Sequence, residues 1–520
     1  MDRLKKFFLN GILMTLVALL VRYVSVGFNV YLSNKIGTVA MGLFTLISSV
    51  YGFALTLATS GISLATTRLV SEALGIGTLK KDISTKATVS AIMKKSIFFS
   101  LSISSFAAIL LFLLSEPIGI KLLGDARTVS SLKILAFSLP PIALSSSLGG
   151  YFGALRRVYK NAIVQILGQA IRIFLSVILL SSITATDMES ACVAIVTAIV
   201  ISETSCFLIH MFLFLTEQKK DDKSSNKKPY SALPKKLIPI TLPVAFSAYM
   251  RSALVTIEHL LIPWGLERSG ASRDISLSAY GTLHSLVFPL VLFPSAISSS
   301  FAGLLVPEIS ESNAAGDRER IERIVCRVLK TVIVYSIGTA GIMMCLSSEL
   351  GHVLFRETDS ATFILMIAPL VPVMYLDTSV DSILKGLGYQ FYTMVVNIVD
   401  ASLSVLLVWI LLPRFGIAGY VMTVYFTEIV NATLSITKLL CVTKVRVRIF
   451  DWIVKPLFSI VISTAAVGYI LRLAGAFASS KIEIALHVCF IAFIYFSMLL
   501  ITRTLSPKKL TRSIKGFIKA

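Results

Sequence analysis

Apolar segments long enough to cross a lipid bilayer recur from one end of this 520-residue chain to the other. A helix needs roughly 20 predominantly apolar residues to span the hydrocarbon layer. Hydrophobic residues make up 55% of the chain and charged residues only 15%, a composition that ordinary soluble domains do not have. The sequence therefore predicts an all-α polytopic membrane protein with about 14 transmembrane helices. The candidate spans are residues 9–33, 39–66, 96–115, 129–152, 162–183, 190–215, 237–262, 276–306, 326–347, 359–383, 391–412, 416–440, 456–474 and 482–502.

The distribution of lysine and arginine predicts the orientation of these spans. Cytoplasmic connections retain basic residues during membrane insertion. If the N-terminus is cytoplasmic, the inner segments hold 36 of the 49 basic residues and the outer segments hold 10. We therefore expect a multi-pass protein of the cell (plasma) membrane with both termini in the cytoplasm. Most of the net charge of +21 then serves topology and attraction to anionic membrane lipids, and no nucleic-acid partner is expected.

Two pairs of similar motifs indicate an internal repeat. LVSEALGIG, which begins at Leu69, resembles LVPEISESNAAG, which begins at Leu305, at an offset of 236 residues. GALRRVYKNAIVQ at Gly153 resembles KGLGYQFYTMVVN at Lys385, at an offset of 232. Transporters are often built from duplicated bundles, and an even number of spans between equivalent positions gives both copies the same orientation. We therefore expect two six-helix lobes related by an axis along the membrane normal, followed by two C-terminal helices.

This repeat divides the chain into four parts. Residues 1–215 form an N-lobe with helices 1 to 6, and residues 237–440 form a C-lobe with helices 7 to 12. Residues 216–236, with the sequence TEQKKDDKSSNKKPYSALPKK, are polar and basic and indicate a flexible cytoplasmic linker. Residues 441–520 hold helices 13 and 14 and a basic cytoplasmic tail.

Two arginines lie in the middle of equivalent apolar spans. Arg22 lies in the first span and Arg251 in the seventh, and the offset of 229 residues that aligns them also places Asn29 on Glu258. A charge at the bilayer centre costs about 2.5 to 3.5 kcal/mol on insertion scales. Because a span that keeps such a charge usually faces a polar cavity, the pair predicts a central pathway for an anionic ligand. The alternative for Arg251 is pairing with Glu258, which lies on the same helix face two turns later.

Three further polar positions lie inside predicted spans. Arg172 follows Gln165 and Gln169 at helical spacing, so this stripe faces either a cavity or a neighbouring helix. Asp377 and Asp381 lie four residues apart on one helix face. Two such carboxylates repel when both are ionised, so one should hold a proton or share a cation.

The aspartate pair is therefore a candidate coupling site for H⁺ or Na⁺. The alternative is neutralisation by Lys385, which lies on the same face near the cytoplasmic end of the span. Isolated acidic residues within spans, such as Glu203, are expected to be hydrogen-bonded packing residues.

Several classes of function are excluded by the absence of their motifs. The six cysteines are scattered without metal-ligand spacing, so neither disulfides nor a metal site is expected. P-loop, HExxH and GxSxG patterns are absent, which argues against an enzyme. The connection after the second span lacks the GxxxDRxGRR pattern of major facilitator carriers. We expect a transporter that needs no cofactor besides a possible H⁺ or Na⁺ coupling ion.

Prolines inside the spans predict helix kinks, because each removes a helix hydrogen bond. Kinked helices can bend between two states, and we expect the two lobes to rock so that a central cavity opens to each side in turn. The prolines are Pro140, Pro141, Pro243, Pro289, Pro294, Pro369 and Pro372.

At this point the chain resembles a known group. The chain resembles the multidrug/oligosaccharidyl-lipid/polysaccharide (MOP) exporter superfamily in three features. These are fourteen spans arranged as six, six and two, the stretch VRYVSVGFNVYLSNKIG and the turn LVPEISESNAAGD. Within this superfamily the chain is most similar to the stage V sporulation protein B and polysaccharide-exporter branch, close to the MurJ-like lipid II flippases. The resemblance implies transport of undecaprenyl-diphosphate-linked sugars from the inner to the outer leaflet, by a monomer that serves cell-wall polymerases in peptidoglycan synthesis or sporulation.

The chain departs from the MurJ-like pattern at several positions. That pattern has an arginine in the first span, which Arg22 matches, followed six residues later by a second arginine and then an aspartate, where this chain has Phe28 and Asn29. An arginine in span eight is also missing, and His284 is the nearest basic residue. A teichoic acid, capsule or spore-cortex precursor is therefore an alternative to lipid II. A multidrug/cation antiporter of the same superfamily is the main rival function.

The chemistry of a lipid diphosphate suits arginine. A guanidinium group is always charged and its planar fork binds phosphate oxygens through two hydrogen bonds. The predicted diphosphate ligands are therefore Arg22 and Arg251, together with Arg172 and with Arg68, which ends the second span where a headgroup would enter. The alternative for Arg68 is an ordinary positive-inside anchor. Asn29, Glu258 and His284 are expected to line the same cavity.

Overall fold

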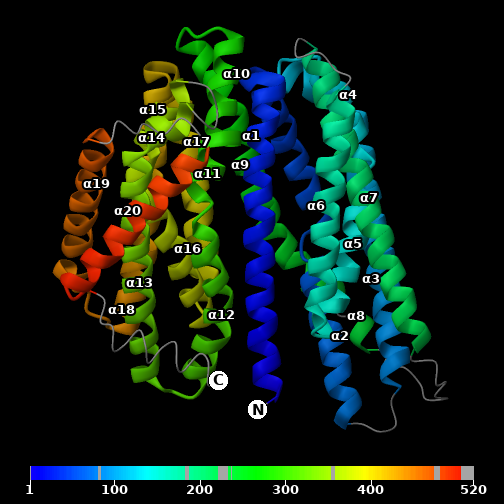
Figure 1. Cartoon of the computed structure of the whole chain (residues 1–520). Helices are drawn as coiled ribbons and strands as arrows, with labels where there is room; N and C mark the ends of the chain where they lie inside the picture. The colour runs from blue at the N-terminus through cyan, green and yellow to red at the C-terminus, as the bar shows by residue number, and fades with distance from the viewer. Residues whose placement is uncertain are drawn as a thin grey trace. The chain divides into compact units, whose positions relative to one another are not determined.

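A computed structural model describes residues 2–79, 84–181, 187–220, 232–235, 237–352, 358–473 and 481–504. Every regular element within these ranges is a helix, which confirms the predicted all-α fold. The first part of the chain holds α1 (Asp2–Thr59), α2 (Ile62–Leu79), α3 (Thr85–Pro117), η1 (Ile118–Leu122), α4 (Thr128–Ala136), α5 (Leu139–Ala154), α6 (Val158–Ser181), α7 (Met188–Lys220) and α8 (Ala232–Lys235). Figure 1 shows these helices along the colour gradient.

The second part of the chain contains the more broken helices. It holds α9 (Leu237–Arg268), α10 (Arg273–Gly281), η2 (Thr282–Val287), α11 (Phe288–Leu292), α12 (Ser295–Ala314), α13 (Arg318–Cys345), α14 (Ser347–Leu350), α15 (Thr358–Ile367), η4 (Ala368–Leu370), α16 (Val371–Gly386), α17 (Gln390–Phe415), α18 (Ile417–Thr443), η5 (Phe450–Val454), α19 (Lys455–Leu473) and α20 (Lys481–Ile501). The elements η1, η2 and η5 are π-helical turns, and η4 is a short 3₁₀ turn.

The number of spans agrees with the sequence. By length and hydropathy, 12 helices of the described residues could cross a membrane, or 13 if α4 and α5, which meet at a bend of 43°, form one span. One of these stretches, Leu19–Leu74, is 56 residues long, more than twice what a single crossing requires. It is interrupted at Gly37, where φ is 79° and ψ is 166°. Counting that stretch as two crossings gives about fourteen, as the sequence predicts.

The helices pack into two compact units. Unit 1 comprises Met1–Asn34 and Gly265–Ala520, and unit 2 comprises Lys35–Trp264. The helix that opens each half of the predicted repeat is therefore placed with the helices of the other half: the first segment of α1 belongs to unit 1, and α9 up to Trp264 belongs to unit 2. The lobe boundaries 1–215 and 237–440 stay a prediction. They were set by repetition in the sequence, whereas the two units are defined by which helices pack together. Most of the predicted linker and of the C-terminal tail lies outside the described residues.

The same helix pairings occur in both units. In unit 2, α2 and α3 pack against α5, and α6 packs against α7. In unit 1, α12 and α13 pack against α16, and α17 packs against α18. The turns after α5 and α16 each contain a residue with a left-handed backbone, Arg156 (φ 58°) and Gly388 (φ 91°), at the offset of 232 residues that aligns the second pair of sequence motifs. These correspondences support the predicted repeat.

Gly150 lies where α2 and α5 approach each other closely. A Cβ atom at Gly150 would lie 2.6 Å from the backbone oxygen of Ser63, and the neighbouring contact is a chain of buried hydroxyls. Thr66 Oγ1 and Ser96 Oγ lie 2.6 Å apart, and Ser96 Oγ lies 2.7 Å from Ser147 Oγ. This small, polar surface holds three helices together at short range, as is common between helices in membranes.

Substitution of Gly150 by alanine is expected to destabilise unit 2 by about 1 to 3 kcal/mol, because the added methyl group meets backbone rather than a movable side chain. The measurement is thermal unfolding of the purified full chain in detergent. Gly52 is the matched control, since a Cβ atom there would meet nothing within 4 Å. An unchanged melting temperature for Gly150→Ala would show that α2 and α5 can separate without cost.

A group of charged side chains joins α6 to the end of α7. Glu217 forms ion pairs with both Lys160 and Arg157. Glu217 and Lys160 are buried, with side-chain exposures of 11% and 10%, and Arg157 is more exposed. The ammonium group of Lys160 also lies 4.7 Å from the centroid of the Phe152 ring. Because Phe152 belongs to the hydrophobic core of unit 2, this group ties the end of α7 to that core.

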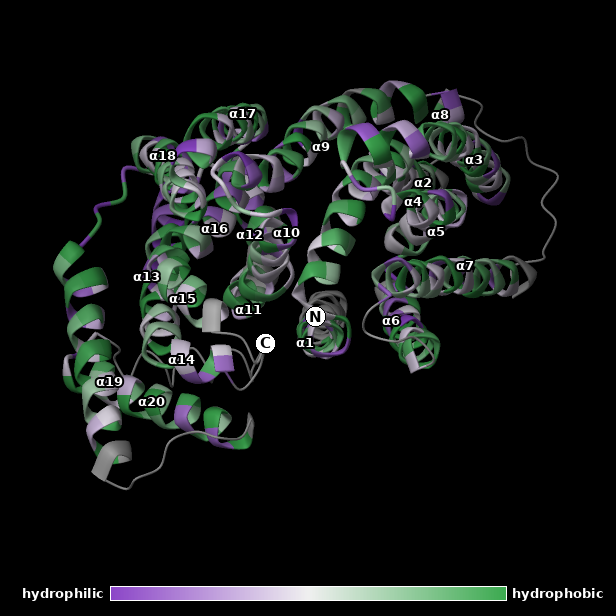
Figure 2. Ribbon diagram, turned by 90° about the horizontal axis from the view of Figure 1, so that it is seen from above, coloured by the Kyte–Doolittle hydropathy of each residue, from purple (hydrophilic) through white to green (hydrophobic). Residues whose placement is uncertain are grey.

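The helices α19 and α20 pack side by side and against α13 in unit 1. Figure 2 shows that both are coloured largely as hydrophobic. Tyr495 of α20 donates a hydrogen bond to the Val334 oxygen of α13 at 2.8 Å, and its ring fills the space beside Gly338. This contact anchors the two C-terminal helices to α13.

Candidate functional site

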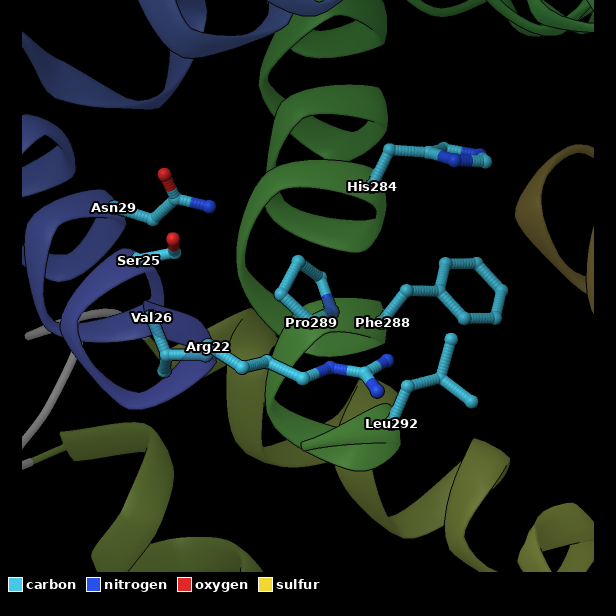
Figure 3. A pocket seen from close by; sticks show the side chains of 8 residues that line it. All are labelled: Arg22, Ser25, Val26, Asn29, His284, Phe288, Pro289 and Leu292. Carbon is cyan, nitrogen blue, oxygen red and sulfur yellow. The ribbon is translucent and has the colours of Figure 1, made fainter. Parts of the chain in front are cut away.

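A cavity of about 330 Å³ lies inside unit 1, between the first segment of α1 and the broken helix formed by η2 and α11. Three residues named from the sequence, Arg22, Asn29 and His284, line it together. The remaining lining residues are Ser25, Val26, Phe288, Pro289 and Leu292. Figure 3 shows the Arg22 side chain extending from α1 across the Pro289 turn, so that its guanidinium group lies beside Phe288 and Leu292.

Arg22 is the charged group of this cavity. Its side chain is half-buried. Among the residues that the structure describes, no carboxylate forms an ion pair with it. A guanidinium group that is partly removed from water and has no carboxylate partner favours an anionic ligand. The apolar side chains Val26, Phe288 and Leu292 around it strengthen that attraction by excluding water.

Asn29 contributes to the cavity by fixing its wall. Pro289 has no N–H to donate to the Ser285 oxygen four residues earlier. Asn29 Nδ2 donates to that oxygen at 3.0 Å, so this side chain satisfies a backbone acceptor that the proline leaves open. One N–H of the Asn29 side-chain amide is therefore occupied by the protein, and Ser25 Oγ likewise donates within α1, to the Val21 oxygen at 2.8 Å.

His284 is held by aromatic residues on the other side of the same helix break. Its Nε2 lies 3.0 Å from the hydroxyl oxygen of Tyr420 in α18. The rings of Tyr280, Phe288 and Tyr420 lie 4.8, 5.2 and 5.7 Å from the imidazole, measured between ring centroids. These contacts fix the orientation of the imidazole at the edge of the cavity.

Arg172 lies in unit 2 and has a carboxylate partner. Its Nη2 donates to Glu203 Oε1 at 3.1 Å, which joins α6 to α7. The sequence predicts that Glu203 is a hydrogen-bonded packing residue, and this hydrogen bond from Arg172 agrees with the prediction, although Glu203 is not isolated. Arg172 Nε is buried and has no hydrogen-bond partner among the residues that the structure describes. The pair favours the neighbouring-helix interpretation of the Arg172 stripe, and a diphosphate role for Arg172 stays a prediction.

Arg251, Glu258 and Arg68 also belong to unit 2. Arg251 is exposed on α9. Two nearby residues of α9 contact the second segment of α1: Ser252 donates to Thr56 Oγ1 and Thr256 donates to the Ser49 oxygen, each at 3.1 Å. Successive helix residues are separated by roughly 100°, so Arg251 does not lie on the face that contacts α1. Glu258 is half-buried two turns later, and Arg68 is exposed at the middle of α2. Their predicted roles in binding stay predictions.

The aspartate pair lies in α16 of unit 1. Asp381 is buried, and its Oδ2 accepts hydrogen bonds from Lys385 Nζ and from Asn397 Nδ2 of α17, each at 3.3 Å. Its other oxygen, Oδ1, is buried and accepts no hydrogen bond in the described residues. Asp377 lies one helical turn earlier and is half-buried. The neutralising contact with Lys385 is therefore present, and the coupling role of the pair stays a prediction.

Sequence reasoning missed the apolar and aromatic part of the site. Phe288 and Leu292 line the cavity, and Tyr420 positions His284. The one signal in the sequence was the pair of prolines, Pro289 and Pro294, which predicts a kink in the eighth span. Nothing in the sequence indicates which helices would lie against that kink.

The fold and the cavity define a multi-pass helical membrane protein with a cationic cavity within one helical unit. The chain matches the model of the polysaccharide biosynthesis protein family over residues 8–313 and the MatE family model over residues 269–410. The chain therefore belongs to the polysaccharide biosynthesis protein family.

Curated relatives and solved structures agree with this assignment. Stage V sporulation protein B of Bacillus subtilis (strain 168) is 23% identical over 523 residues, which cover 98% of each chain. The uncharacterized membrane protein YabM of the same organism is 20% identical over 79% of this chain and 75% of its own length.

Among solved structures, the lipid II flippase MurJ in an inward closed conformation superposes with a TM-score of 0.68 at 14% identity, over 94% of this chain and 98% of its own. An inward-facing multidrug resistance MATE family transporter of the MOP superfamily gives 0.63 at 12% identity, over 82% of this chain and 96% of its own. These similarities show a shared fold, and the family match over residues 8–313 confirms the polysaccharide part of the predicted branch.

Proposed function

We propose that this protein translocates an undecaprenyl-diphosphate-linked oligosaccharide, lipid II or another cell-envelope precursor, from the inner to the outer leaflet by alternating access. The observation that carries the proposal is Arg22, a guanidinium group within a span that lines a cavity and forms no ion pair in the described part of the chain. An intramembrane charge is costly, so its retention without a protein counter-ion favours a ligand that supplies the negative charge. The similarity to stage V sporulation protein B supports a role in sporulation, and the match to the polysaccharide biosynthesis protein family supports a polysaccharide precursor as the substrate.

The size of the cavity limits what Arg22 can hold. A volume of about 330 Å³ is at the low end of the range for small-ligand pockets. A space of this size suits a phosphate or diphosphate group and is too small for a complete lipid-linked oligosaccharide. We therefore assign the anionic part of the headgroup to Arg22, with Arg251 as the second proposed arginine ligand. The sugar and the lipid chain would lie elsewhere on the protein.

We further propose the plasma membrane as the location, with both termini in the cytoplasm, and a monomer that hands its product to cell-wall polymerases. The distribution of basic residues supports the orientation. Arg68, which is exposed on α2, and Arg172, once it is released from Glu203, are secondary candidates for contact with the headgroup during passage.

Asp381 is the proposed coupling residue, because its buried Oδ1 accepts no hydrogen bond in the described residues and could accept a proton or contact a cation. Substitution by asparagine is expected to reduce the transport rate to the value seen without an ion gradient, since the amide carries no charge to exchange. The measurement is transport in proteoliposomes with an imposed Na⁺ or H⁺ gradient.

The control for Asp381→Asn is Asp451→Asn. Asp451 also pairs with a lysine four residues later, Lys455, at 2.5 Å, but its side chain is 37% exposed whereas that of Asp381 is 11% exposed. Loss of a surface pair of this kind has little effect, so Asp451→Asn should keep the gradient dependence. Equal gradient dependence in wild type and Asp381→Asn would remove Asp381 from the coupling mechanism.

A multidrug/cation antiporter is the second candidate function, and the match to the MatE family model over residues 269–410 favours it. Depletion of the protein from its native cell separates the two functions. A flippase should leave a lipid-diphosphate sugar accumulating in the inner leaflet. Increased sensitivity to cationic dyes without any accumulating lipid intermediate would favour the antiporter and contradict our proposal.

A further inference from the structure

The wall of the Arg22 cavity is a helix whose hydrogen-bond ladder is interrupted. It consists of the π-helical turn η2, the short helix α11 and a two-residue break before α12. Pro289 and Pro294 lie at this interruption and cannot donate backbone hydrogen bonds. In lipid, a backbone carbonyl left without a donor is costly unless another group of the protein replaces the donor.

The hydroxyl of Tyr375 occupies the position of a missing helix hydrogen bond. It donates to the Val291 oxygen at 2.6 Å and accepts a hydrogen bond from the backbone N–H of Ser295. In a continuous helix, the N–H of Ser295 would donate directly to the oxygen of Val291. The phenol is therefore inserted between the donor and the acceptor, and a side chain inserted into the ladder is a recognised cause of a sharp kink.

A second tyrosine supports the same break from a different helix. Tyr335 of α13 donates to the Pro294 oxygen at 3.1 Å. Its ring stacks on that of Tyr375, with 6.2 Å between the centroids and 30° between the planes. Tyr375 itself is fully buried, so its hydroxyl has no access to water.

The inserted hydroxyl also connects the break to the charged group of the cavity. The segment that it bends carries Phe288, Pro289 and Leu292, which line the cavity around the guanidinium group. The position of this wall relative to Arg22 therefore depends on a hydrogen bond from α16, a helix that does not itself line the cavity.

We propose that Tyr375 is a positioning residue for headgroup binding, whose hydroxyl holds the bend at Val291–Ser295 and thereby sets the distance between the cavity wall and Arg22. This inference rests on the proposed function, in which Arg22 binds a diphosphate. Without the hydroxyl, the ladder can close between Ser295 and Val291, and the wall moves with it.

The test is Tyr375→Phe in the purified full chain, which removes the hydroxyl and keeps the ring that stacks on Tyr335. We expect the dissociation constant for inorganic pyrophosphate to rise about 3- to 10-fold, the change that corresponds to one neutral hydrogen bond. In proteoliposomes the KM for an undecaprenyl-diphosphate sugar should rise by a similar factor. A purely structural defect would instead reduce the amount of active protein, which lowers the maximal rate and leaves KM unchanged.

Tyr495→Phe is the matched control. Tyr495 is also a buried tyrosine of unit 1 whose hydroxyl donates to a backbone oxygen, that of Val334, but this oxygen lies within the continuous helix α13. The control should lower thermal stability and leave pyrophosphate affinity and KM as in wild type. Wild-type affinity and KM in Tyr375→Phe would overturn the positioning role.

Arg22→Gln distinguishes this inference from the proposed function. If Arg22→Gln loses pyrophosphate binding while Tyr375→Phe binds like wild type, only the positioning role is wrong. If Arg22→Gln binds like wild type, the proposed function is wrong at this site, and the role of Tyr375 in headgroup binding is wrong with it.

Discussion

Replacement of Arg22 by glutamine is expected to slow translocation of an undecaprenyl-diphosphate sugar by about 10- to 100-fold, because a hydrogen bond to a charged group contributes roughly 1.5 to 3 kcal/mol. Arg22→Lys should retain part of the rate, since lysine keeps the charge but lacks the planar fork that binds two phosphate oxygens. Arg251→Gln tests the second proposed ligand and should also slow transport. The measurement is the transfer of a fluorescent lipid-linked sugar across proteoliposome membranes.

The control for Arg22 is Arg273→Gln. Arg273 lies in the same unit and is paired with Glu267, so its charge is already neutralised within the protein. The variant Arg273→Gln should therefore transport at the wild-type rate. Wild-type transport by Arg22→Gln, with normal folding and insertion, would contradict the assignment of the cavity to the diphosphate.

The second large effect is expected at Glu217, and it concerns stability. Glu217→Ala removes the carboxylate that is paired with the buried Lys160. Removal of one partner of a buried ion pair costs about 3 to 5 kcal/mol. For a unit of this size that loss corresponds to a fall in melting temperature on the order of 10 °C. Thermal unfolding in detergent, followed by size-exclusion chromatography after heating, measures it.

An exposed ion pair provides the comparison for Glu217. Glu308 and Arg320 approach to 3.8 Å with side-chain exposures of 48% and 44%. Glu308→Ala should change stability by less than about 1 kcal/mol, because solvent screens such a pair. A double variant Glu217→Ala with Lys160→Met should recover part of the loss, since it removes the buried charge as well as its partner. Equal melting temperatures for Glu217→Ala and wild type would show that Lys160 finds another way to be neutralised.

Much of the fold could be predicted from the sequence, because hydropathy and charge act over single segments. The length of each apolar window determines whether it can cross the bilayer. Most windows coincide with single helices of the described residues, whereas the windows 39–66, 129–152 and 276–306 each contain a helix break. The repeat could also be detected, since Arg156 and Gly388 occupy the same left-handed turn in the two halves. The sequence could not predict that the first helix of each half belongs to the unit formed by the other half. That membership depends on which helix surfaces pack together in three dimensions.

The candidate site could be predicted only in part. Arg22 stood out because a charge in an apolar span is expensive, and Asn29 and His284 prove to line the same cavity. Arg172 stood out for the same reason, but it lies in the other unit and is paired with Glu203. A sequence shows that a span contains a charge, and it does not show whether a partner from another helix neutralises that charge.

The sequence by itself therefore determined the class of protein, the approximate number of spans and the presence of an intramembrane arginine, since each follows from the transfer of individual segments from water to lipid. Only the tertiary structure decided which arginine lines a cavity without an ion pair to a described carboxylate and which side chains complete the broken helix beside it. The physical reason is that three backbone oxygens along this broken helix, those of Ser285, Val291 and Pro294, accept hydrogen bonds from side chains of three other helices, which meet only in the folded chain.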